Sequence, residues 1–290
     1  MKLALGTAQI GLDYGVANVD GQPSLDRARS MVECARQLGF DTIDTAIAYG
    51  DSESRLGQIG VSGWNVFSKL PPVPPQTEDV AKWVDGQVAS SLKHLGVKRL
   101  SGMLLHRALD LKSHSGHALY AALSDLRVRG LVKRIGISVY GPDELDALYD
   151  DFQFDLVQAP CNILDRRLTQ SGWLKKLEQR GTEVHIRSVF LQGLLLMRAA
   201  DRPPAFTRWQ SLWTIWDHWL RDTNTSPIAA CLRYAMSVSG VSRIVVGADS
   251  PEQLAEMVAA LDGPLPSLPA GLACDDVDLI VPSNWPSFTH

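Results

Sequence analysis

The feature that most constrains the fold of this chain is a regular alternation of short β-rich runs with longer amphipathic stretches. Eight runs have the length and the apolar, β-branched content of buried strands, and helical periodicity separates them. The predicted strands are Lys2–Thr7, Thr42–Thr45, Asn65–Lys69, Gly102–His106, Arg134–Val139, Phe154–Ala159, Glu183–Ser188 and Arg243–Gly247. Eight βα units close a parallel barrel, so the sequence predicts an α/β fold, a (β/α)8 TIM barrel, and we expect one domain over residues 1–290.

Between the predicted strands, helix boundaries can also be located. Ser24 and the Ser250–Pro251 pair are helix-start signals, and Gly39 and Gly96 are typical of residues that follow a helix end. Helices are expected over Leu25–Leu38, Ser52–Ile59, Thr77–Leu95, Ser115–Arg129, Pro142–Tyr149, Thr169–Arg180, Pro227–Val238 and Pro251–Leu261. The competing doubly wound sheet would carry GxGxxG after its first strand, whereas the sequence there is LGTAQIG. The chain opens directly on the first strand, so no N-terminal hairpin is expected.

A long insertion interrupts the alternation after the seventh strand, over Val189–Ser226. Four tryptophans follow one another at helical spacing within it: Trp209, Trp213, Trp216 and Trp219. Such a stripe predicts one buried face of a helix, with a lid or an oligomer contact as the alternatives. The Pro-rich segment Leu265–His290 is expected to form an irregular strap.

Charge and cysteine content limit the classes of function. The 28 Lys and Arg against 32 Asp and Glu give a net charge of −4, which argues against a nucleic-acid or anionic-membrane partner. The four cysteines form no CxxC pair, so we expect reduced thiols and no metal site. The sequence has neither a signal-peptide pattern nor an apolar window of membrane-spanning length, and a cytoplasmic location is therefore expected.

Polar residues close three neighbouring strands of the predicted barrel, where catalytic groups of such barrels lie. Asp44 ends the second strand, with Tyr49 in the loop that follows; Lys69 ends the third and His106 the fourth. Polar groups that end apolar strands are costly unless they are paired or used. Taken singly, each residue also has a structural explanation. Asp44 could cap a turn and Tyr49 could be a loop aromatic. Lys69 could extend its ammonium to solvent, and His106 could be a hydrogen-bonded structural residue. Their joint occurrence predicts a catalytic site.

These residues also carry a resemblance to the aldo-keto reductases, which extends over nearly the whole chain. The segments GFDTIDTAIAYGDSESRLG, FSKL and LLHR resemble the parts of that family that hold its Asp, Tyr, Lys and His. QAPCNILDRR, RSVFLQGLL and VVGADSPEQLAE resemble its cofactor-binding segments. The resemblance implies a barrel that binds a nicotinamide cofactor without a Rossmann domain and reduces aldehydes or ketones.

The roles that follow suit the chemistry of these residue types. Tyr49 would give a proton to the developing alkoxide as general acid, and Lys69 is a cation that favours its phenolate form. Asp44 would hold the Lys69 ammonium, and His106 would donate a hydrogen bond to the substrate oxygen.

Cofactor contacts come from the resemblance as well. The resemblance implies that Ser138 and Gln158 bind the carboxamide, and that Arg187 stands where the family usually stacks an aromatic on the nicotinamide. It implies pyrophosphate contacts at Ser188, Phe190, Leu191 and Gln192, and adenosine contacts at Gly247, Asp249, Gln253 and Glu256. NADPH is the cofactor that the family implies. The Asp249 carboxylate would repel a 2′-phosphate and suits a ribose diol, so NADH is the alternative.

Two other functions remain open at this point. One is a nucleotide-binding regulatory or redox-sensing barrel with little turnover. The other is a lyase or isomerase with Lys69 as a Schiff base, which would leave Tyr49 and the carboxamide-binding residues unexplained. The substrate is expected to be a small-molecule carbonyl compound, and Tyr14 and Trp64 are candidate walls of its pocket.

Overall fold

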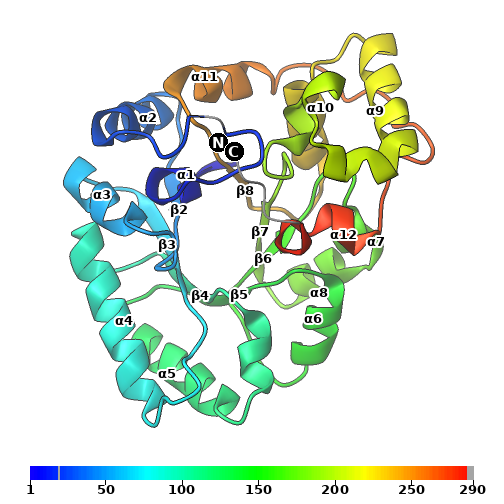
Figure 1. Ribbon diagram of the computed structural model, residues 1–290. Coiled ribbons are helices and arrows are strands. Elements are labelled where there is room, and N and C mark those ends of the chain that lie inside the picture. The colour runs from blue at the N-terminus through cyan, green and yellow to red at the C-terminus, as the bar shows by residue number, and fades with distance from the viewer. Residues whose placement is uncertain (19, 286–290) are drawn as a thin grey trace.

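The computed structural model describes residues 1–18 and 20–285, and its centre is a closed barrel of eight parallel strands. Each strand pairs with the next along the chain, and the last pairs with the first (Figure 1). The strands are β1 (Leu3–Gly6), β2 (Thr42–Asp44), β3 (Asn65–Leu70), β4 (Gly102–Leu105), β5 (Ile135–Ser138), β6 (Leu156–Pro160), β7 (Glu183–Arg187) and β8 (Arg243–Val246). The predicted TIM barrel is confirmed, and every predicted strand overlaps an observed one, although β3 and β6 each run one residue past the predicted end.

Burial on both faces explains why the strands read as nearly continuous apolar runs. All residues of β4, β5 and β6 are buried, with one face in the barrel and the other under the helices. Neighbouring strands approach closely at Gly136, where an added Cβ would lie 2.2 Å from the carbonyl oxygen of Leu156. The sequence therefore has glycine at a position where the barrel leaves no room for a side chain.

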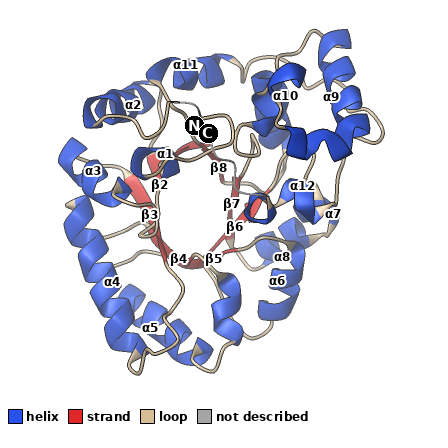
Figure 2. Cartoon of the chain, viewed as in Figure 1, coloured by secondary structure: helices blue, strands red, loops and turns tan. Residues whose placement is uncertain are grey.

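The longer helices form a ring around the barrel (Figure 2). The helices are α1 (Ala8–Gly11), α2 (Leu25–Gln37), α3 (Ser52–Ile59), α4 (Val80–Leu95), α5 (Gly116–Val128), α6 (Pro142–Leu148), α7 (Arg167–Gln170), α8 (Trp173–Gln179), α9 (Gln210–Asp222), α10 (Pro227–Ser237), α11 (Pro251–Ala259) and α12 (Val277–Ile280). None of those in the described residues is long and apolar enough to cross a membrane.

Two predicted helix boundaries were wrong. The helix expected over Thr169–Arg180 is two helices, α7 and α8, because Gly172 between them takes a left-handed φ of +79°. The helix expected from Thr77 begins at Val80, where the Asp79 side chain accepts a hydrogen bond from the backbone N–H of Lys82 at 2.9 Å.

The insertion after β7 forms the 3-10 turns η2 (Leu194–Leu196), η3 (Ala199–Asp201) and η4 (Pro204–Trp209), and then α9, which lies outside α10 in Figure 1. Trp213, Trp216 and Trp219 on α9 are buried, as the stripe predicted, whereas Trp209 lies in η4 before the helix and is only half-buried. The indole of Trp213 donates to the carbonyl of Phe206, and that of Trp219 donates to the carbonyl of Ser267, both at 2.9 Å. The stripe is therefore the core between the insertion and the C-terminal segment.

The C-terminal segment after α11 is largely irregular, as expected, with α12 and the turn η5 (Pro282–Asn284) near its end. The backbone N–H of Cys274 donates to the carbonyl of Leu164, which ties the segment to the loop after β6. Residues 286–290 of the predicted strap lie outside the described residues.

Candidate functional site

A pocket of about 550 Å³ opens at the carboxyl ends of the strands. This position follows from its lining, which includes residues at or within two positions of the ends of all eight strands: Gly6, Asp44, Lys69, His106, Ser138, Gln158, Arg187 and Gly247. Loops from both ends of the chain complete it, since Tyr14, Asn18, Pro282 and Ser283 also line it. The pocket occupies the face at which barrels of this kind carry their sites.

At the floor of the pocket, Asp44 and Lys69 form a buried ion pair. The Lys69 Nζ donates to Asp44 Oδ1 at 2.6 Å and to the carbonyl of Thr45 at 2.9 Å, and the two side chains are 1% and 5% exposed. Burial lowers the pKa of the Lys69 ammonium, but the adjoining Asp44 carboxylate outweighs it, so the pKa lies above its ordinary value. Lys69 is therefore a fixed cation at neutral pH.

Tyr49 and His106 stand above this pair. The Lys69 Nζ lies 5.2 Å from the centre of the Tyr49 ring. The Tyr49 and His106 rings meet edge to face, with centroids 5.6 Å apart and an interplanar angle of 80°. Burial, and then the positive charges of Lys69 and Arg187, lower the pKa of His106 to about 4. The four residues that the sequence singled out thus line one pocket, and the imidazole among them is neutral at physiological pH.

Ser138 and Gln158 lie side by side at the ends of β5 and β6, both buried. The Gln158 Nε2 donates to Asp44 Oδ2 at 2.7 Å across the barrel. Because a carboxylate can only accept there, the amide nitrogen faces Asp44 and the amide oxygen is turned away. That oxygen, Oε1, is buried and has no partner among the described residues. An orphaned acceptor of this kind fits a ligand that brings an N–H donor, such as a carboxamide.

The loop after β7 has strained backbone at three residues that are not glycine. Ser188, Leu191 and Gln192 take φ values of +60°, +49° and +53°, in the left-handed region that such residues rarely adopt. The backbone N–H groups of Phe190 and Gln192 find no acceptor within residues 1–18 and 20–285. Free N–H groups on such a turn fit an anionic oxygen. The Leu191 side chain is fully buried outside the pocket lining, and its backbone N–H already donates to the carbonyl of Ser188 at 3.0 Å, so the free donors of this loop are those of Phe190 and Gln192.

The far end of the pocket is acidic. Gly247, Asp249, Gln253 and Glu256 line it, and the backbone N–H of Asp249 donates to Gln253 Oε1 at 2.7 Å. Burial raises the pKa of Asp249, and the charge of Arg27 on α2 opposes that rise.

Arg233 on α10, the helix before α11, is held away from this end of the pocket. Its guanidinium donates to the carbonyls of Ala260, Asp262 and Pro264 beyond α11. Arg27, which sequence reasoning missed, is the cation whose charge reaches Asp249, and it pairs with Asp20 at 3.6 Å.

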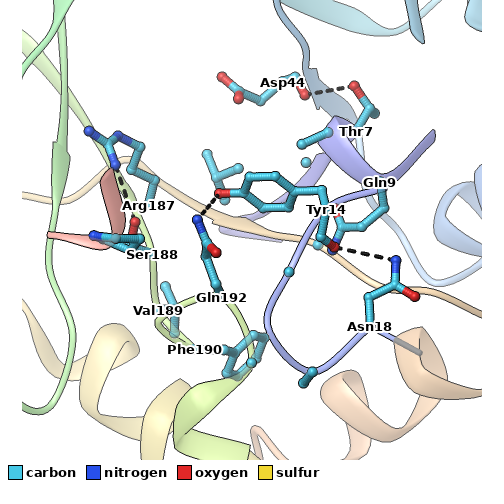
Figure 3. Close-up of a pocket in the computed structure, with 18 of the residues that line it drawn as sticks. Thr7, Gln9, Tyr14, Asn18, Asp44, Arg187, Ser188, Val189, Phe190 and Gln192 are labelled. Atoms are coloured by element: carbon cyan, nitrogen blue, oxygen red, sulfur yellow. Dashed lines mark hydrogen bonds between the residues drawn. The ribbon is translucent and has the colours of Figure 1, made fainter. Parts of the chain in front are cut away.

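The two pocket-wall candidates have opposite outcomes. Tyr14 lines the pocket and reaches across it to the β7 loop, where Gln192 Nε2 donates to its hydroxyl at 3.3 Å (Figure 3). The prediction for Trp64 was wrong, because this residue precedes β3 at the amino end of the barrel. The guanidinium carbon of Arg36 lies 5.1 Å from the centre of its ring. Sequence reasoning also missed Gln9, Asn18 and Tyr140 in the lining, since none of them ends a strand.

The residues present fit an elongated nicotinamide dinucleotide better than a metal. Among residues 1–18 and 20–285 no group of His, Cys, Asp or Glu could hold a metal ion. The orphaned Gln158 oxygen and the free N–H groups of the β7 loop supply an acceptor for an amide and donors for a phosphate.

Comparisons with known proteins agree with this geometry. A family model described as "Aldo/keto reductase family" matches residues 2–268. The chain is 27% identical to a D-threo-aldose 1-dehydrogenase from Pseudomonas sp, with 93% of each chain covered. It is 26% identical to the NADH-specific methylglyoxal reductase of Escherichia coli K12, over 90% of this chain and 93% of that protein. An aldo-keto reductase from Bacillus halodurans, in its holo form, shares the fold with a TM-score of 0.73 at 20% identity, covering 91% of this chain and 88% of that one.

Proposed function

The chain belongs to the aldo/keto reductase family, and on that premise we propose that it is a nicotinamide-dependent carbonyl reductase for a small aldehyde or ketone. Membership of the family, together with the named relatives, makes it an oxidoreductase, and the family uses nicotinamide cofactors. The observation that carries the proposal is the buried Asp44–Lys69 pair, which holds a cation 5.2 Å from the ring of Tyr49 at the floor of the pocket.

In the proposed reaction, Tyr49 delivers a proton to the carbonyl oxygen while the carbonyl carbon accepts a hydride. The cofactor supplies that hydride when bound, and the products are an alcohol and the oxidised cofactor. Lys69 holds positive charge beside the phenol as its proton leaves, and Asp44 keeps the ammonium in place. His106, neutral, is placed to donate a hydrogen bond to the developing alkoxide. Solvent returns the proton to Tyr49.

Contacts with the cofactor are proposed from the same geometry. Ser138 and the free oxygen of Gln158 would hold the carboxamide. Ser188 and the backbone N–H groups of Phe190 and Gln192 would hold the pyrophosphate, with the acidic end at Asp249 facing the adenosine.

Polar side chains are part of the pocket lining, beside apolar residues such as Leu196 and Ile228. Tyr14, Tyr140, Gln192 and Ser283 bring hydroxyl and amide groups to the lining. Such walls favour a small oxygen-rich carbonyl compound, and the named relatives act on an aldose and on methylglyoxal. The test is the loss of absorbance of NADH or NADPH with methylglyoxal or an activated aromatic aldehyde, together with identification of the alcohol. Cofactor binding without any turnover on such a panel would favour the regulatory barrel instead.

The low pKa of His106 predicts a dependence of stability on pH. An imidazole held neutral in the fold contributes stability above its unfolded pKa of about 6.5. That contribution is lost as the pH falls toward the folded value of about 4. His106→Asn should therefore lose less stability on acidification from about pH 7 to about pH 5 than the wild type does. Denaturant unfolding at both pH values measures this, and parallel losses in the two proteins would show that His106 is not held neutral.

We further propose that Asp249 shifts the cofactor preference toward NADH. Its carboxylate lines the acidic end of the pocket, and Arg27, a cation whose charge reaches it, is paired with Asp20. Asp249→Arg should improve NADPH binding by about 1–3 kcal/mol through charge-assisted hydrogen bonds, and NADH binding should change little.

Dissociation constants for both cofactors, from quenching of tryptophan fluorescence, measure this preference. Asp249→Asn is the matched control, because it removes the repulsion without adding a cation and should give only part of the gain. A wild type that prefers NADPH a hundredfold, with a ratio that Asp249→Arg does not move, would place this carboxylate away from the ribose.

A further inference from the structure

Arg187, the last residue of β7, places a cation inside the pocket. Its Nη1 donates to Ser188 Oγ at 3.2 Å (Figure 3). Its Nη2 donates to the carbonyl of Val139 at 3.0 Å. Its guanidinium carbon also lies 5.0 Å from the centre of the Tyr140 ring. These contacts hold the guanidinium in one place on the pocket wall.

The same contacts fix which part of the pocket the charge faces. Arg187 ends β7, Val139 follows β5, and β6 lies between these two strands in the barrel. The side chain therefore crosses the carboxyl end of β6, the strand that carries Gln158. The guanidinium and the orphaned amide oxygen of Gln158 thus flank the same region, next to the catalytic groups.

The charge of Arg187 is not neutralised by its partners, which are a carbonyl, a hydroxyl and an aromatic ring. In the described part of the chain no carboxylate forms an ion pair with it, although its charge reaches Glu144 and opposes the rise of that carboxyl's pKa. Its field also reaches the catalytic residues, since it contributes to the lowering of the His106 pKa and opposes the rise of the Lys69 pKa. The pocket therefore carries one cation paired with Asp44 and, on its wall, a second cation without an ion-pair partner among the described residues.

We propose that Arg187 makes this site bind the reduced nicotinamide cofactor in preference to the oxidised one. The inference rests on the proposed function, which brings the nicotinamide ring beside Gln158. The oxidised ring carries a positive charge that the reduced ring lacks, so a neighbouring unbalanced cation repels only the oxidised form. A neutral aromatic side chain at the end of β7 would not discriminate in this way. Partial screening by water limits the expected preference to roughly tenfold.

The experiment measures dissociation constants of NAD+ and NADH, and of NADP+ and NADPH, by titration calorimetry. The proteins are the wild type, Arg187→Gln and Arg187→Lys, with Arg198→Gln as the control because Arg198 is an exposed arginine of the insertion, with an 84% exposed side chain. The wild type should bind the reduced form roughly tenfold more tightly. Arg187→Gln should lose most of that ratio, mainly through tighter binding of the oxidised form. Arg187→Lys and Arg198→Gln should keep it.

Each other result has a definite meaning. A wild type that binds both forms equally overturns the inference, whether or not Arg187→Gln folds. An unchanged ratio in Arg187→Gln, together with a raised KM for carboxylate-bearing aldehydes only, also overturns it and assigns Arg187 to anionic substrates. In both cases carbonyl reduction by the wild type would leave the proposed function intact. Failure of the wild type to bind either form would overturn both.

Discussion

Replacing Tyr49 with phenylalanine should lower carbonyl reduction by about 10²–10⁴-fold, the usual cost of removing a general acid. The ring contacts with His106 and Lys69 depend on the aromatic ring, so they survive the change. The proposed cofactor contacts lie on other strands, at Ser138 and Gln158. We therefore expect kcat to fall while the dissociation constant for the cofactor stays within about twofold of the wild type, a change well under 1 kcal/mol.

Tyr14→Phe is the matched control for this variant. It removes another phenol of the pocket lining, whose hydroxyl accepts from Gln192 at 3.3 Å. Loss of one such neutral hydrogen bond costs about 1 kcal/mol, so turnover should fall less than about tenfold. Reduction by Tyr49→Phe at more than a tenth of the wild-type rate would remove Tyr49 from the mechanism. A larger loss in Tyr14→Phe than in Tyr49→Phe would transfer the acid role to Tyr14.

The barrel and its catalytic floor could be predicted because they depend on local signals. A short apolar run in the sequence predicts each strand, and a parallel barrel brings the carboxyl ends of all its strands to one face. Asp44 and Lys69 end neighbouring strands, so their pairing follows from topology, and the structure contains it. Helix ends were less predictable, since Gly172 divides one predicted helix through a φ value that the sequence pattern does not specify.

Contacts between distant loops could not be predicted in the same way. Tyr14 and Gln192 are 178 residues apart, and their contact depends on how two irregular loops fold over the pocket. The bond from Gln158 to Asp44 spans 114 residues and crosses the barrel interior. The sequence likewise left open which way the long Arg187 side chain turns, and its bond to Val139 sets where its charge acts. Side-chain direction, rather than residue type, is the information that required the structure.

Lys69→Met should give the second large effect, on activity and on stability together. The variant removes the cation beside Tyr49 and leaves the Asp44 carboxylate buried without its ion-pair partner, since Asp44 is only 4% exposed. Breaking a buried pair by removing one partner typically costs about 3–5 kcal/mol of folding stability. We expect that loss in denaturant unfolding at neutral pH, with carbonyl reduction reduced by at least about a hundredfold.

The double variant Asp44→Asn/Lys69→Met separates the two effects. It removes the unpaired negative charge of residue 44. The new amide oxygen can still accept a hydrogen bond from Gln158 Nε2, which donates to Asp44 at 2.7 Å in the wild type. Its stability should recover toward that of the wild type, since a pair replaced on both sides leaves no buried charge, whereas its reductase activity should stay lost. Recovery of activity along with stability would mean that Lys69 acts only by holding the fold. A double variant as unstable as Lys69→Met would mean that the cost comes from lost packing rather than from an unpaired charge.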